Sequence, residues 1–210
     1  MKKIIRGLSE ILVKEKSKLK FIVIIFIVGV IFGSLFINFI SANDRLILIN
    51  QVEEYFLNIK NLSKDVFGIN AFFSNLLNNE LKLFIIFILG LSIVGVLVVI
   101  FIIFFKGFML GTTLSTIILK YKLKGLLGCL LYIFPVGILN MFIYFYISLY
   151  AVHVSSLFLK TLIRKDKLNF RLFYTKYLIA FIMCFILMAL VCLIDSYLTP
   201  IITKLFTLII

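Results

Sequence analysis

Few side chains in this sequence could act together in catalysis or metal binding. His153 is the single histidine, and no acidic residue lies near it in the sequence. Cys129, Cys184 and Cys192 all lie in apolar runs, where a thiol behaves as a small hydrophobic side chain. Cys184 and Cys192 cannot form a disulfide, because their spacing corresponds to about 12 Å of helical rise. We therefore predict that the protein is not an enzyme and binds no metal or cofactor.

Three polar residues inside apolar runs need separate explanations. Asn140 follows Pro135 and Gly137, and its amide can satisfy backbone groups that a proline leaves unpaired or can bond across helices. Asp195 would suggest a proton or ion path if it were buried in a membrane. The polar residues that follow Asp195 favour a solvated helix end instead. For His153, we expect a hydrogen bond to a carbonyl of a neighbouring helix.

The surrounding composition is that of a membrane protein. The chain has 210 residues, of which 63% are apolar and 15% charged, too little polar surface to cover a soluble domain. Residues 83–105 contain no charge and match a hydrocarbon core roughly 30 Å thick. We predict an all-α fold: an integral membrane helical bundle of about five transmembrane helices, with a short interfacial or re-entrant helix and an extracytoplasmic helical segment.

Apolar runs and their polar interruptions divide this single membrane domain, residues 1–210, into consecutive segments. In chain order they are a cytoplasmic amphipathic helix (1–20), span 1 (21–42), an extracytoplasmic helical segment (43–82), span 2 (83–105), an interfacial or re-entrant helix (107–124), a two-span hairpin broken near 135–140 (125–159), a basic cytoplasmic loop (160–176), span 5 (177–198) and an extracytoplasmic tail (199–210).

The path of residues 107–140 has an alternative. Residues 107–119 are apolar but few for an ordinary span, and Lys120, Lys122 and Lys124 follow them. The alternative sends residues 107–119 across the membrane and leaves these lysines outside. It opposes the usual charge bias, so we favour the interfacial or re-entrant helix.

Basic residues set the predicted orientation. Residues 1–20 carry seven Lys or Arg and residues 160–176 carry six, whereas residues 43–80 carry three against five acids. Lys and Arg collect on the cytoplasmic side of a bilayer, so we predict a cytoplasmic N-terminus and a C-terminus outside the cell membrane. Basic membrane flanks also account for the net charge of +13, which indicates membrane lipids rather than nucleic acid as a partner.

Residues 43–80 are the candidate surface for a protein partner. They combine polar residues with apolar ones at helical spacing, which predicts two amphipathic helices separated near residues 67–70. This segment is either a docking surface for an extracytoplasmic partner or a cap resting on the bundle. The apolar residues of the candidate surface are Val52, Phe56, Ile59, Phe67, Phe72 and Phe73.

Gly29 and Gly33 form a GxxxG face in span 1. Such a face lets two helix backbones approach closely, either within one chain or between two copies of it. A homo-oligomer is therefore an open alternative.

Another set of residues follows a definite order along the chain. They are Asn79 ahead of a span, Gly90 and Gly95 within it, Lys106, Gly107, Phe108 and Gly111 after it, and Pro135, Gly137 and Asn140 before another span. Their order and spacing resemble the stage II sporulation protein M family over nearly the whole chain.

This resemblance implies a multi-pass protein of the mother-cell or septal membrane that acts when a forespore is engulfed. Family members are regarded as components of a complex with two extracytoplasmic peptidoglycan-degrading proteins, a lytic transglycosylase and an amidase/endopeptidase. The expected role is a non-enzymatic anchor or scaffold. The alternative is a permease subunit working with a cytoplasmic ATPase, and a proton-coupled carrier would require Asp195 or His153 to be buried.

Overall fold

The computed structural model describes residues 15–61, 66–133, 136–164 and 170–207, and this part of the chain is built from helices. This result confirms the predicted all-α class. All of the helices except α3 are long and apolar enough to cross a membrane, which gives five candidate spans. The helices are α2 (Lys16–Phe39), α3 (Ala42–Lys60), α4 (Ile69–Gly90), α5 (Gly95–Ile133), α6 (Val136–Arg164) and α7 (Phe170–Thr207).

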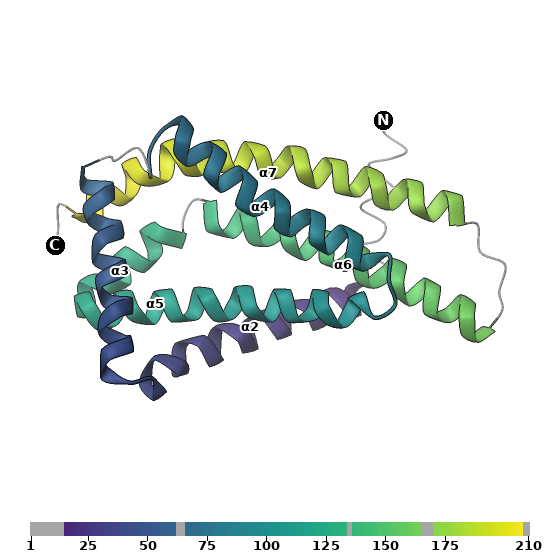
Figure 1. The fold of residues 1–210 in the computed structure, drawn as a ribbon, viewed down its shortest axis with the longest axis horizontal. Helices are drawn as coiled ribbons and strands as arrows, with labels where there is room; N and C mark the ends of the chain where they lie inside the picture. The colour runs from purple at the N-terminus through teal and green to yellow at the C-terminus, as the bar shows by residue number, and fades with distance from the viewer. Residues whose placement is uncertain (1–14, 62–65, 134–135, 165–169, 208–210) are drawn as a thin grey trace.

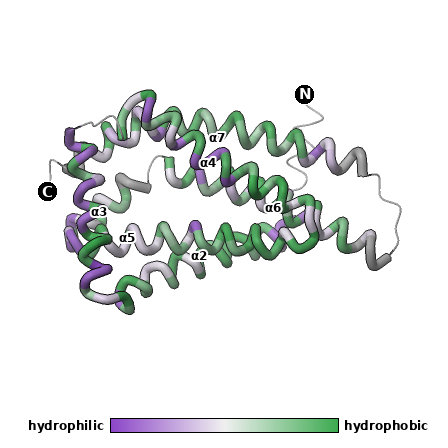
Figure 2. Tube along the Cα trace, in the orientation of Figure 1, coloured by the Kyte–Doolittle hydropathy of each residue, from purple (hydrophilic) through white to green (hydrophobic). Residues whose placement is uncertain are grey.

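The five long helices form an elongated bundle, and α3 lies across one of its ends (Figure 1). Helix α2 packs along α5, while α4, α6 and α7 pack together on the other side. We name the end that carries α3 the α3 end, and the opposite end, where α4 turns into α5, the turn end. Apolar residues follow the long helices, and hydrophilic residues gather on α3 (Figure 2).

Helices α2 and α5 pack through glycines on both sides. A Cβ atom at Gly29 or Gly33 would overlap the carbonyl oxygen of Phe104 or Phe108. In the same way, a Cβ atom at Gly107 or Gly111 would overlap backbone carbonyls of α2. The GxxxG face of the first span is therefore occupied within the chain, by a second pair of glycines with the same spacing.

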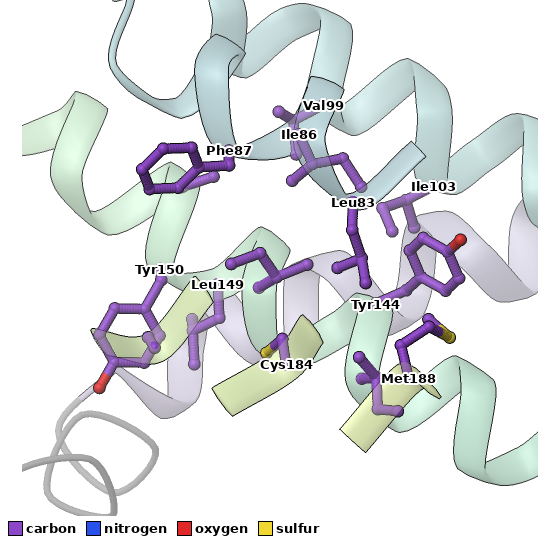
Figure 3. Packing of buried hydrophobic residues seen from close by; sticks show 14 of the residues in the cluster. Leu83, Ile86, Phe87, Val99, Ile103, Tyr144, Leu149, Tyr150, Cys184 and Met188 are labelled. Atoms are coloured by element: carbon purple, nitrogen blue, oxygen red, sulfur yellow. The ribbon is translucent and has the colours of Figure 1, made fainter. Parts of the chain in front are cut away.

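A packed core of buried hydrophobic side chains joins the long helices (Figure 3). Leu83 and Ile86 of α4, Ile147 of α6 and Met188 of α7 are each fully buried there. The hydroxyl of Tyr177 donates to the carbonyl oxygens of Ile86 and Phe87, at 3.3 and 3.0 Å. Since lipid is as apolar as these side chains, this core is stabilised mainly by close contact and by such interhelical hydrogen bonds.

The prediction of one span over residues 83–105 is wrong. Helix α4 ends at Gly90 and α5 begins at Gly95, so this apolar run turns back on itself. A Cβ atom at Gly95 would overlap the carbonyl of Leu89, so the turn requires a glycine there. The hydroxyl of Ser155 donates to the carbonyl oxygen of Ser92 at 2.9 Å and holds the turn against α6. Residues 69–82, predicted to lie outside the membrane, form the first half of α4.

The prediction of a separate helix over residues 107–124 is also wrong. These residues continue α5 up to a kink at Lys122, whose backbone is non-helical, with φ 50° and ψ −128°. The chain follows the alternative path, which places the three lysines at the α3 end. The ammonium of Lys120 pairs there with the carboxylate of Glu53 in α3, at 2.7 Å. This pairing gives Lys120 a counter-charge at the α3 end.

Residues 125–159 do not form a two-span hairpin. They complete α5, which ends at Ile133, and then supply most of α6, which begins at Val136 and runs without interruption to Arg164. Pro135 lies outside the described residues. The predicted basic loop over 160–176 is shorter than expected, because α6 and α7 extend into it.

The last helix continues past residue 198, where span 5 was predicted to end. Helix α7 passes through Pro200 and reaches Thr207. A proline inside a helix cannot donate to the carbonyl four residues earlier, which here is that of Ser196. The backbone N–H of Gly68 donates to this carbonyl instead, at 3.3 Å. Gly68 has φ 98°, a conformation that favours glycine.

Candidate functional site

A cavity of about 790 Å³ lies between α4, α5 and α6, toward the α3 end of the bundle. Its walls are mainly apolar, but polar and charged side chains also line it. Five of these side chains come from four helices and were not expected to meet. They are Asn75 and Lys82 of α4, Lys106 of α5, Asn140 of α6 and Asp195 of α7.

Lys106 is held over an aromatic ring. Its ammonium nitrogen lies 3.3 Å from the centroid of the Tyr144 ring, a cation–π contact. Tyr144 is fixed in turn, because its hydroxyl donates to the side-chain oxygen of Asn79 at 3.1 Å. Gly107, the residue after Lys106, seats α5 against α2 and so fixes the rotation of α5 at this level.

A second polar chain joins α4 to α7. The Asn79 amide nitrogen donates to the backbone oxygen of Asn75 at 3.0 Å, and the Asn75 amide donates to the Asp195 carboxylate at 3.4 Å. Asn75 also donates to the hydroxyl of Ser196 at 3.4 Å. Asp195 was predicted to lie at a solvated helix end, whereas the structure places it in the wall of the cavity. The motif residue Asn79 thus connects Tyr144 with the Asp195 region.

Two further polar groups are buried without a hydrogen-bond partner among the described residues. One is the amide oxygen of Asn140, and the other is the carboxyl group of Glu80, which is 8% exposed. Sequence reasoning overlooked Glu80, although a carboxylate directly before an apolar run is a visible signal.

The cavity is closed toward the turn end. Its lining residues extend no further in that direction than Ile85 of α4, Phe101 of α5 and Tyr144 of α6. Beyond them lies the packed core, with Phe87 and Val99 among its buried residues (Figure 3). As far as the described residues show, the arrangement can therefore receive a ligand but does not form a passage from one end of the bundle to the other.

Helix α3 is fastened across the α3 end. The Ser41 side chain caps its first turn by accepting from the N–H of Asp44 at 3.2 Å. The Phe56 ring packs edge-on against Tyr121 of α5, with ring centroids 5.6 Å apart. Phe56 and Ile59 are 3% and 0% exposed, in a cluster with Ile117. Their burial means that these two residues of the predicted partner surface face the bundle and are not available to a partner.

The other residues of that predicted surface are divided. Phe67 is partly buried and packs against Tyr197, with ring centroids 5.7 Å apart, and Val52 and Phe72 are also partly buried. Phe73 is exposed. The opposite face of α3 is open, and it presents Leu46, Ile47 and Leu57 between polar residues that include Asn50 and Glu54.

His153 lies in a charged cluster near the turn end. Its Nδ1 lies 2.9 Å from the carboxylate of Glu15, which also pairs with the ammonium of Lys18 at 3.2 Å. Lys18 donates to the hydroxyl of Ser156 at 2.8 Å. Burial raises the pKa of Glu15, but the hydrogen bonds and charges of Lys18 and His153 together hold that pKa below its ordinary value. The long sequence separation concealed this acidic partner of His153.

The described residues contain no group of three His, Cys, Asp or Glu side chains able to hold a metal ion. The motif residues serve two purposes in the structure. Asn79, Lys106 and Asn140 contribute to the polar cavity or its support, while Gly90, Gly95, Gly107, Phe108 and Gly111 occupy close helix contacts or the turn.

The model of the family described as Stage II sporulation protein M matches residues 22–200, which is most of the chain. No curated protein and no solved structure matches.

Proposed function

The chain belongs to the stage II sporulation protein M family, and from this we propose a non-enzymatic membrane anchor that holds peptidoglycan-degrading enzymes at the septal membrane during engulfment. Membership implies a sporulation membrane protein. One observation carries the proposed anchoring role. Helix α3 is a polar helix that lies across one end of an apolar bundle, with one face packed against the bundle and the opposite face exposed.

Charge distribution supports an orientation with the N-terminus inside. The basic segments 1–20 and 160–176 join the bundle at its turn end, where α2 starts and where α6 leads into α7. The positive-inside rule assigns that end to the cytoplasm. Helix α3 and the end of α7 then lie outside, where α3 can meet extracytoplasmic enzymes.

The open face of α3 has the composition of a modest protein interface. Leu46, Ile47 and Leu57 are each more than half exposed, and polar side chains separate them. Apolar contacts within a polar rim suit a non-obligate partner. By family resemblance, the proposed partners are a lytic transglycosylase and an amidase/endopeptidase.

The test is a pair of charge-matched double variants in sporulating cells. Leu46→Asp with Leu57→Asp places two negative charges on the open face of α3 without touching its buried face. Asn70→Asp with Asn78→Asp adds the same charge at exposed positions of α4 and is the control. We expect the first double variant to lose most hydrolase co-purification and the control to retain it. Undiminished recovery with the first variant, with membrane insertion verified, excludes this surface.

One observation favours a second candidate, the subunit of a transporter. The cavity contains Lys106 and Asp195, and such residues inside a membrane often mark solute paths. The closed turn end requires a conformational change for passage. Recovery of a cytoplasmic ATPase with the tagged protein, in place of hydrolases, supports this candidate over the anchor.

A further inference from the structure

We propose that the cavity between α4 and α5 is a binding site for the phosphate headgroup of an acidic phospholipid, with Lys82 and Lys106 as its cationic ligands. This site is separate from the α3 surface and goes beyond the proposed anchoring role.

The charges in the cavity require an anion. Lys82 and Lys106 both line it, from α4 and α5 respectively, and each repels the other electrostatically. Among the described residues, neither lysine forms an ion pair with a carboxylate. Lys106 is partly buried and Lys82 lies exposed beside it on an apolar bundle, and cations within a membrane are costly unless a counter-charge accompanies them. A phosphate group between them would satisfy both.

Asp195 does not supply that counter-charge. It lines the same cavity, but its carboxylate accepts from the amide of Asn75. Among the described residues, no ion pair joins Asp195 to Lys82 or to Lys106. The positive part of the cavity therefore stays available to a ligand.

The form of the cavity favours a lipid over a soluble anion. Four of its lining residues, Ile85, Phe101, Phe105 and Met109, are also exposed on the apolar outer surface of the long helices. The mouth therefore opens sideways, toward the acyl chains of a bilayer. A headgroup between the lysines can leave its acyl chains on these four side chains, whereas a free phosphate ion gains nothing from them.

The volume and the chemistry of the walls agree with this occupant. About 790 Å³ lies within the range of pockets that hold drug-sized ligands, and a phospholipid headgroup is of that class. Apolar walls with a few polar groups are typical of such sites. Lysine binds phosphate as a point charge and needs no fixed fork geometry.

Native mass spectrometry of the full chain in neutral detergent tests the proposal. Phosphatidylglycerol is the probe and phosphatidylcholine, which has no net charge, is its control. Lys82→Gln is the main variant, because Lys82 is exposed and its replacement leaves the core intact. Lys106→Gln is the second variant, and Lys176→Gln, an exposed lysine near the other end of the bundle, is matched for charge.

We expect wild type and Lys176→Gln to retain phosphatidylglycerol in preference to phosphatidylcholine. Lys82→Gln should bind phosphatidylglycerol about tenfold more weakly, as expected for loss of one charge-assisted hydrogen bond. Three outcomes overturn the proposal: equal retention of the two lipids by wild type, equal weakening by Lys82→Gln and Lys176→Gln, or displacement of the lipid by millimolar inorganic phosphate. Because Lys82→Gln leaves α3 unchanged, hydrolase co-purification with this variant separates failure of this site from failure of the anchor.

Discussion

Substitution of Gly33 by valine tests the packing on which the bundle depends. A Cβ atom at this position overlaps the carbonyl oxygen of Phe108, and the carbonyl belongs to the backbone of α5, so it cannot rotate away. Helices α2 and α5 must separate locally. Overpacking lowers the free energy of unfolding by about 1–3 kcal/mol. Because the neighbouring atom here is a rigid backbone carbonyl, we expect a loss near the upper end of that range. Valine has a higher helix propensity than glycine, but this difference offsets only about 0.4 kcal/mol of the packing cost.

The net loss is therefore about 2–3 kcal/mol, equivalent to a change of roughly 30- to 150-fold in the folding equilibrium. Unfolding by denaturing detergent in mixed micelles, followed by circular dichroism, measures it. Val28→Leu is the control, because it adds apolar volume to an exposed position of the same helix. If Gly33→Val is as stable as the control, the close approach of α2 and α5 does not contribute as described.

Two further predictions concern polar groups. Tyr177→Phe removes the hydroxyl that donates to the carbonyl oxygens of Ile86 and Phe87, and we expect a loss of about 1 kcal/mol in the same unfolding assay. Because the folded-state pKa of Glu15 is lowered, its contribution to stability is present above the ordinary pKa of 4.5 and disappears as the pH falls through the lower folded value. Glu15→Gln should therefore remove part of the stability difference between pH 7 and pH 4, and an unchanged pH profile would contradict this.

The helical class could be predicted because composition alone determines it. A chain that is 63% apolar must be helical or a closed barrel within a lipid bilayer, and long continuous apolar runs indicate helices. The path within those runs was harder to predict. The turn between Gly90 and Gly95 is built from Leu91, Ser92, Ile93 and Val94, so it carries almost no polar signal. Its stability comes from Ser155, which is distant in the sequence.

The lysines after residue 119 belong to the same helix as residues 107–119, whereas the charge rule had led us to predict a separate interfacial helix. The positive-inside rule counts Lys and Arg in short segments and takes no account of their ion-pair partners. Lys120 has a carboxylate partner in Glu53, but that partner lies on a helix whose placement across the bundle cannot be deduced from α5 alone. Two residues of the predicted partner surface are buried for a reason that the sequence does not show. Periodicity identified an apolar face of α3 around Phe56 and Ile59, but it could not distinguish a face that binds the bundle from one that binds another protein.

Side chains of the candidate site were visible individually in the sequence, but not as a site. Asn79, Lys106 and Asn140 were selected as motif residues, and Asp195 as a polar residue near a helix end. Their convergence depends on the rotation of four helices, to which glycine contacts and the Tyr144 hydrogen bonds contribute. Such tertiary information is absent from local patterns.

The cavity bears on the proposed anchoring role but does not contradict it. A scarcity of reactive side chains suggested that the bundle does no chemistry, yet Lys82, Lys106 and Asp195 surround one internal space. Charged groups that serve transport must be reached from both membrane surfaces in the course of a cycle. Here buried core residues, among them Phe87 and Val99, close the cavity toward the turn end. A ligand can reach the cavity through the sideways mouth or from the α3 end. A site that is open to lipid on one side and closed toward the turn end is compatible with the proposed anchoring through α3.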